Sequence, residues 1–287
     1  MSMNKIIWLA SYPKSGNTWT RILLGNYLLS DKQAISINEL SKVTKTDVRQ
    51  DLYDKAAGRP FVANDFDDAI ALRPKVQRII AAESQGHQFV KTHSKIERIG
   101  NVDLILPEVT AAAVYIMRNP FDVAPSFAHH TGQSIDEIID NMTNPRMIFS
   151  SQTQIMEVLG SWDAHVASWL NAPGLPRHVM RYEDMIGDTE KTIRGLLQFL
   201  QVPVRDGPLR RAIRMSSFKE LQKQEATRGF RERPQQVDKF FRKGRSGSWR
   251  DELTPAQVGR IREAFLPTLE AHYPEMLGET DAFASSG

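Results

Sequence analysis

The sequence predicts an α/β fold, with a central parallel sheet, helices on both faces, and a P-loop-like phosphate-binding loop after the first strand. Short apolar, β-branched runs alternate with amphipathic stretches, as buried parallel strands and their connecting helices do. A turn of small residues joins the first run to the first helical segment. No repeat, low-complexity stretch or linker divides the 287 residues. We therefore expect residues 1–287 to form a single domain.

The expected elements follow in chain order. A buried strand at residues 5–10 leads into a turn at 11–16, after which Asn17 is suited to cap a helix. Near the end, residues 254–257 (Thr-Pro-Ala-Gln) form a capping box with proline at the first helical position. The other expected strands are 88–92, 111–117 and 179–182, and the other expected helices are 76–83, a segment from Phe121, 152–170 and 189–200.

Composition excludes several kinds of chemistry. The chain has no cysteine, so it forms no disulfide, no thiolate metal site and no cysteine nucleophile. The apolar run at residues 6–10 stops at Tyr12-Pro13-Lys14, well short of a secretory signal, and no stretch approaches the ~20 apolar residues of a membrane span. We expect a cytoplasmic protein without a membrane span.

Charge is concentrated in one segment. The net charge of +3 is too small to predict binding to a nucleic-acid polymer. Residues 228–250, however, contain eight Lys or Arg and two acids, a net +6. A solvated surface is the usual origin of such a run. Here it is interleaved with Phe240, Phe241, Gly244 and Trp249, and glycines admit an anion to the backbone while aromatic rings stack on a base. The segment therefore favours a small anionic ligand with a ring.

Residues 12–19 (Tyr-Pro-Lys-Ser-Gly-Asn-Thr-Trp) are the strongest single motif. Backbone amides at a helix N-terminus, together with a lysine and hydroxyl groups, can cradle a phosphate. The Walker A ending Gly-Lys-[Ser/Thr] is missing, and with it the usual magnesium-binding hydroxyl. A plain glycine turn between strand and helix is the structural alternative, but the Lys-Ser-Gly run followed by tryptophan favours a ligand site.

With these motifs the chain resembles the PAPS-dependent (cytosolic-type) sulfotransferases. Their phosphosulfate loop, Tyr-Pro-Lys-Ser-Gly-x-x-Trp, is matched at residues 12–19. Their Arg-Asn-Pro-x-Asp-x-x-x-Ser signature is matched at 118–126, and Arg-Lys-Gly-x-x-Gly-x-Trp at 242–249. Shorter matches at 91–93, 182–185 and 217–220 fall between them in the family's order.

The resemblance implies a co-substrate, 3′-phosphoadenosine 5′-phosphosulfate (PAPS), which leaves as its desulfated product PAP. It places residues 14–18 on the 5′-phosphosulfate, and Arg118 and Ser126 on the 3′-phosphate with 242–244 closing over it. Aromatic residues among the matches surround the adenine. The implied cofactor-binding residues are Lys14, Ser15, Gly16, Asn17, Thr18, Trp19, Arg118, Ser126, Tyr182, Ser217, Phe218, Phe241, Arg242, Lys243 and Gly244.

The resemblance also implies the catalytic residues. His93 matches the family's general base, and histidine suits that role because it titrates near neutrality. Lys14 would stabilise charge on the leaving nucleotide, Lys91 would hold the sulfonate, and Ser126 would restrain Lys14 until the acceptor arrives. No metal is expected. Ligands of open α/β sheets bind at the carboxyl ends of the strands, where His93 is predicted to lie.

Two other classes of function remain open from the sequence. A P-loop kinase or NTPase fits the strand-loop-helix order but not the Walker pattern. A non-catalytic nucleotide-binding protein would be expected to lose Lys14 or His93, and both are present. His129 and His130 match no catalytic position and are expected to have no role.

The acceptor is expected to be a small molecule that offers a hydroxyl, or alternatively an amine, and not a nucleic-acid polymer. Parts of residues 31–75, 127–150 and 222–240 are expected to bind it, with Phe66, Phe127, Phe149 and Phe230 as candidate apolar contacts. The oligomeric state is left open, because the family's dimer motif is degenerate across Arg250–Gly259.

Overall fold

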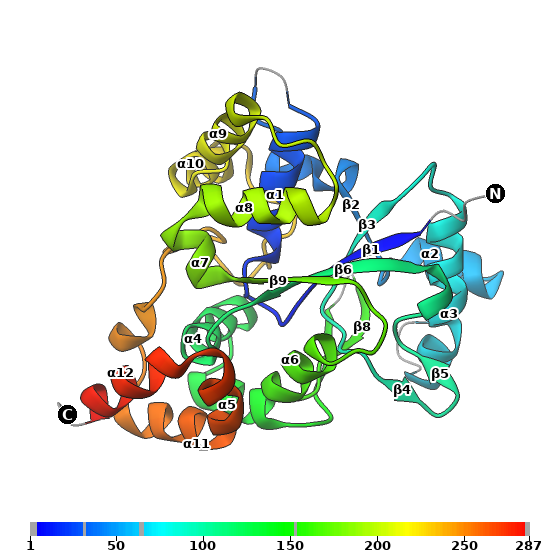
Figure 1. The fold of residues 1–287 in the computed structure, drawn as a ribbon. Helices are drawn as coiled ribbons and strands as arrows, with labels where there is room; N and C mark the ends of the chain where they lie inside the picture. The colour runs from blue at the N-terminus through cyan, green and yellow to red at the C-terminus, as the bar shows by residue number, and fades with distance from the viewer. Residues whose placement is uncertain (1–4, 31–32, 63–65, 152–153, 285–287) are drawn as a thin grey trace.

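A central five-stranded sheet organises the molecule (Figure 1). The computed structural model describes residues 5–30, 33–62, 66–151 and 154–284. The strand order is β2-β3-β1-β6-β9 and every pairing is parallel, so the predicted α/β class is confirmed. The strands are β1 (Ile6–Ser11), β2 (Thr44–Thr46), β3 (Gln88–Thr92), β6 (Thr110–Met117) and β9 (Arg177–Arg181).

Helices cover both faces of the sheet because the strands are apolar on both sides. Along β1, Ile6, Trp8 and Ala10 join one hydrophobic cluster, and the alternate residues Ile7 and Leu9 join a second. One cluster packs beneath α1 (Asn17–Leu28), α7 (Tyr182–Gly187), α8 (Thr189–Phe199) and α9 (Asp206–Met215). The other packs beneath α2 (Gln50–Ala57), α3 (Phe66–Ala82), α4 (Pro120–Thr131), α5 (Ile135–Thr143), α6 (Trp162–Leu170), α11 (Pro255–His272) and α12 (Pro274–Ala284).

Smaller elements complete the fold. In the described part of the chain, two short antiparallel hairpins lie outside the main sheet, and three 3-10 helices connect longer elements. These are β4 (Arg98–Ile99) with β5 (Val102–Asp103), β7 (Ile148–Ser151) with β8 (Gln154–Val158), η1 (Ile37–Lys42), η2 (Pro107–Val109) and η3 (Ser248–Asp251), besides the helix α10 (Phe218–Arg228). No helix in the described ranges is long and apolar enough to cross a membrane.

The predicted helix over residues 152–170 is wrong. Its first part is the strand β8, which pairs antiparallel with β7, and α6 begins only at Trp162. Gly160, with φ at +63°, lies between the two elements. Tertiary pairing with β7 therefore overrides the helical pattern of this segment. Residues 152 and 153 lie outside the described part of the chain.

Two local predictions at helix ends had different outcomes. Gly16, not Asn17, caps α1, and the Asn17 side-chain amide instead donates to the Leu9 carbonyl at 2.9 Å. The capping box at the start of α11 is confirmed, because the side chains of Thr254 and Gln257 bond each other's backbone amides. The degenerate dimer motif is thus, in this structure, a capped helix start.

Candidate active site

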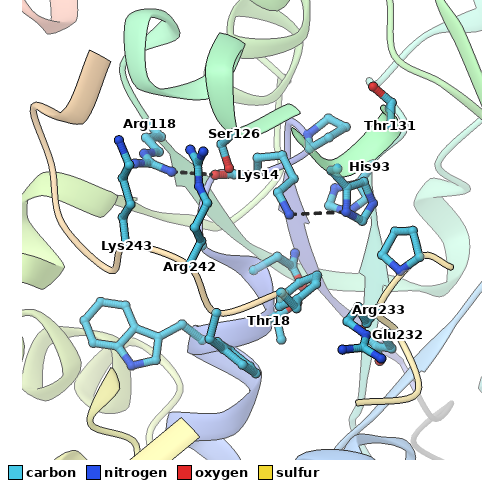
Figure 2. Close-up of a pocket in the computed structure, with 18 of the residues that line it drawn as sticks. Lys14, Thr18, His93, Arg118, Ser126, Thr131, Glu232, Arg233, Arg242 and Lys243 are labelled. Carbon is cyan, nitrogen blue, oxygen red and sulfur yellow. Dashed lines mark hydrogen bonds between the residues drawn. The ribbon is translucent and has the colours of Figure 1, made fainter. Parts of the chain in front are cut away.

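One cavity, of about 1060 Å³, gathers nearly all of the residues that the sequence predicts to be functional. It lies where β1, β3, β6 and β9 end, since Lys14, His93, Arg118 and Tyr182 each follow one of these strands. Figure 2 shows Lys14, His93, Arg118 and other lining residues turned toward a common space. Of the predicted site residues, only Ser15 and Ser217 do not line it.

The conformation of the loop between β1 and α1 would allow a ligand to approach its backbone closely. Gly16 has φ at +103°, and a Cβ there would lie 2.7 Å from the Tyr182 ring. The non-glycine residue Lys14 is also left-handed, with φ at +68°. The Ser15 hydroxyl and the Asn17 Oδ1 atom are buried and have no hydrogen-bond partner among the described residues. Buried polar atoms are normally paired, and an anionic group in this loop would accept from the Ser15 hydroxyl, whereas the Asn17 Oδ1 atom can only accept and needs a donor.

Cations surround the same loop. The pKa of Lys14 falls to about 7, first because the side chain is buried and then because Arg118, Arg242 and Lys91 are close. Arg118 lies 4.2 Å over the Tyr182 ring and donates to the Lys14 carbonyl at 3.1 Å, while its Nε atom is buried without a partner. Asp122 and Glu252 offset part of this charge, and the excess of cations over these two carboxylates suits a multiply charged anion.

Asp122 connects two of the sequence motifs, at 118–126 and 242–249, in the folded structure. It is buried at 1% exposure, and its Oδ2 accepts from the Gly247 amide at 2.8 Å. Its Oδ1 accepts from the Trp249 amide at 3.0 Å. The carboxylate of the 118–126 motif thus fixes the backbone of the 242–249 motif, 125 residues away in sequence.

The basic loop at 242–249 has a partner that the sequence analysis did not identify. Glu252 bonds Arg242 at 2.9 and 3.1 Å, and also Lys243 at 2.8 Å. Gly244, with φ at +60°, passes so close to Phe218 that a Cβ would lie 2.3 Å from the ring. The loop therefore presents two cations beside an aromatic wall, and only glycine fits between them.

The His93 imidazole has a defined tautomer. Its Nδ1 atom lies 2.7 Å from the Ser11 carbonyl oxygen. Because a carbonyl can only accept, Nδ1 carries the proton and Nε2 keeps a lone pair. Burial, followed by the charge of Lys91, holds the pKa of His93 well below its usual range. His93 is therefore a neutral imidazole near neutral pH, with a free basic nitrogen.

The backbone of His93 is held by two residues that the sequence analysis missed. Glu157 on β8 accepts from the His93 amide at 2.6 Å, and the His165 Nε2 atom donates to the His93 carbonyl at 3.0 Å. Tyr115 bonds the other nitrogen of His165 at 2.9 Å. No local pattern could have revealed Glu157, because its role depends on the hairpin that the sequence analysis read as a helix.

Lys14 has an unexpected partner in His130. The Lys14 Nζ atom lies 3.4 Å from the His130 Nδ1 atom and 4.3 Å from the centre of the Phe240 ring. His130, which the sequence analysis left without a role, lines the cavity. Within the described ranges Ser126 also lines it but makes no hydrogen bond to Lys14, so the restraint of Lys14 by Ser126 stays a prediction.

Of the four phenylalanines considered for the acceptor, only Phe149 lines the cavity. Phe127 and Phe230 are buried in two different hydrophobic clusters, and Phe66 packs against the cluster of Phe127 and against a smaller one that contains Ile70. The wall beyond His93 is mixed in polarity. It includes Thr131, Gln133, Asn141, Met147, Ile148, Ser150, Arg231, Glu232, Arg233, Pro234, Gln235 and Gln236.

The sheet, the loop after β1 and the cation-lined cavity define an α/β protein with an anion-binding site at the carboxyl edge of its strands. Comparison with known proteins gives the family. The family model described as a sulfotransferase domain matches residues 4–273, so the chain belongs to the PAPS-dependent sulfotransferase family and is an enzyme of that class. This assignment sets aside the P-loop kinase alternative.

Relatives and solved structures agree with this assignment. The chain is 23% identical to mouse sulfotransferase 2A2, over 93% of this chain and 85% of that protein. It is 26% identical to human sulfotransferase 1E1, over 95% of this chain and 83% of that protein. The crystal structure of mouse sulfotransferase SULT7A1 complexed with PAP has the same fold, with a TM-score of 0.62 and 20% identity over 100% of this chain and 90% of that one. Retinol dehydratase in complex with androsterone and PAP is similar, with a TM-score of 0.61 and 19% identity over 92% of this chain and 80% of that one.

Proposed function

We propose that this enzyme transfers the sulfuryl group of PAPS to a hydroxyl group, or alternatively an amine, of a small molecule, with His93 as general base. One observation carries the proposal: a neutral imidazole with a free Nε2 shares a cavity with Lys14 and the cations Arg118, Arg242 and Lys243. The PAP complexes of structurally similar proteins support the choice of nucleotide.

The nucleotide is assigned to the loop after β1 and the basic loop. The Ser15 hydroxyl and the backbone amides at the start of α1 suit the 5′ group, and Arg118 with residues 242–244 suits the 3′-phosphate. The edge-to-face pair of Trp19 and Tyr182, 6.0 Å apart, offers aromatic surface to the adenine together with Phe218 and Phe241. Ser217, which immediately precedes α10 and so adjoins Phe218, does not itself line the cavity.

The catalytic assignment follows from protonation states. When bound, PAPS supplies an activated sulfuryl group whose bond to the phosphate oxygen breaks as the acceptor oxygen attacks sulfur. His93 Nε2 takes the proton of the acceptor hydroxyl, because it is the unprotonated nitrogen. The Lys14 ammonium neutralises charge that develops at the phosphate end, while Lys91, which lines the same cavity, holds the sulfonate oxygens. Ser126 orients Lys14.

A small molecule is the acceptor best supported by the cavity. A volume of about 1060 Å³ holds a nucleotide and a compact second ligand. The wall around Phe149 mixes apolar groups with amides and guanidinium groups, so a ring with polar substituents fits better than a purely apolar one. A single domain, a cytoplasmic location and independence of metal ions complete the proposal.

Transfer of radiolabelled sulfate from PAPS to a library of small hydroxyl and amine acceptors tests this function, with purified protein and EDTA present. We expect labelled product without added metal. Magnesium-dependent phosphate transfer from ATP, with no sulfate transfer to any acceptor, would contradict the proposal.

A further inference from the structure

The backbone of Lys14 belongs to the loop between β1 and α1, but its ammonium group lies next to His130. The Lys14 carbonyl accepts from Arg118, which fixes the backbone beside the other cations. The side chain extends away from Arg118 and Lys243 and toward the imidazole side of the cavity (Figure 2). Its ammonium group lies 3.4 Å from the His130 Nδ1 atom. Repulsion from Arg118 and Arg242 gives a physical reason for this direction.

His130 is suited to accept this hydrogen bond. An ammonium group can only donate, so Nδ1 must hold a lone pair and the proton lies on Nε2. Burial and the charge of Lys14 lower the pKa of His130 to about 2, which keeps the ring neutral. The ring meets Phe240 edge to face at 6.0 Å, and the His130 carbonyl accepts from Gln236 at 3.0 Å. Both contacts hold His130 in place.

Helix α4 offers Lys14 two acceptors in succession. Ser126 and His130 are four residues apart, so they lie on one face of the helix and about 6 Å apart along its axis. Both line the cavity, and the preceding residue His129 does not. His129 instead bonds the Lys239 carbonyl at 3.2 Å. It is therefore a matched control on the same helix.

We infer that His130 is a positioning residue for Lys14: its Nδ1 atom holds the Lys14 ammonium away from the phosphate loop in the free enzyme, and nucleotide binding breaks this contact. The inference rests on the proposed function, because Lys14 must move to reach the nucleotide. His130 therefore weakens nucleotide binding, and its removal should strengthen it. A purely structural residue would have the opposite effect, since its loss would loosen the cavity.

Two variants separate the hydrogen bond from the shape of the side chain. His130→Phe keeps a ring but has no acceptor, whereas His130→Asn places Oδ1 close to the position of the Nδ1 atom. The net contribution of an ordinary hydrogen bond changes affinity about three- to tenfold. We expect calorimetry at pH 6.5, where Lys14 is mostly protonated, to give a Kd for PAP that is about three- to tenfold lower in His130→Phe and unchanged in His130→Asn. His129→Phe should behave as the wild type.

NMR of the nucleotide-free protein, labelled with ¹³C at the lysine ε position, gives a readout that does not require the proposed function. The Lys14 resonance, assigned with Lys14→Arg, should show a lower pKa in His130→Phe than in His130→Asn, because the ammonium has lost its acceptor. Equal Lys14 pKa values in the two variants would overturn the inference, as would a weaker or unchanged PAP Kd in a folded His130→Phe. If the Lys14 pKa is lower in His130→Phe than in His130→Asn but the enzyme does not bind PAP, the contact is supported and the proposed function is refuted.

Discussion

The lowered pKa of Lys14 predicts that the affinity for the nucleotide depends on pH. The group has a pKa of about 7 in the free protein, against an ordinary value of 10.5, because it is buried among Arg118, Arg242 and Lys91. A bound polyanion would offset those charges and return the pKa toward its ordinary value. The complex then holds a proton that the free enzyme loses above pH 7, so affinity is greatest at low pH and falls as pH rises.

The size of the change in Kd with pH follows from the pKa of Lys14 in the free protein. With a pKa of about 7, the Kd should grow as 1 + 10^(pH − 7), which gives about a sixteenfold weakening between pH 7 and pH 8.5. Nucleotide phosphates have second pKa values near 6 and are already ionised in this window. His93 and His130 have lowered pKa values, so both are neutral throughout.

Isothermal titration calorimetry with PAP measures this directly. Kd is determined at four pH values from 7 to 8.5, and proton uptake is obtained from buffers of different ionisation enthalpy. Lys14→Arg is the matched control, because arginine keeps its charge across the window and should give a flat profile. A flat wild-type profile, or an equal slope in the arginine variant, would refute the assignment of Lys14 to the nucleotide.

Three further predictions concern side chains around the cavity. Gly244→Ala should weaken PAP binding about tenfold or more, because its Cβ would meet an aromatic ring at 2.3 Å; Gly58→Ala has a similar positive φ but no neighbour within 4 Å and should leave the Kd unchanged. Glu157→Leu should lower kcat about ten- to hundredfold with an unchanged PAP Kd, because the amide of His93 loses its acceptor; Glu157→Gln should restore activity, and equal rates in the two variants would contradict this role. Arg118→Met should weaken PAP binding at least tenfold, and an unchanged calorimetric Kd would exclude its assignment to the nucleotide.

Much of the part of the cavity that we assign to the nucleotide could be predicted to come together, because its motifs are local in sequence. The loop at 12–19 joins one strand to one helix, so its residue types and order nearly determine its form. The motifs at 118–126 and 242–249 are likewise short, and Asp122 brings them together through backbone hydrogen bonds. Parallel strand order then places all of these loops at one edge.

The site residues that the sequence analysis did not identify depend on contacts between segments that are distant in sequence. Glu157 reaches His93 only because residues 154–158 form a strand, and that strand depends on pairing with β7. His130 reaches Lys14 across 116 residues, and its sequence neighbour His129 turns to a different partner. The two histidines are the same residue type and adjacent in sequence. Only the orientation of α4 therefore determines which of them faces Lys14.

Single-turnover sulfate transfer from PAPS by wild-type protein and by His93→Ala tests the central claim most directly, with the PAP Kd measured on both. General-base catalysis contributes about 10²–10⁴-fold, so the variant should transfer sulfate that much more slowly while it binds PAP as tightly as the wild type. Undiminished transfer by a folded His93→Ala enzyme would contradict the assignment of His93 as the base.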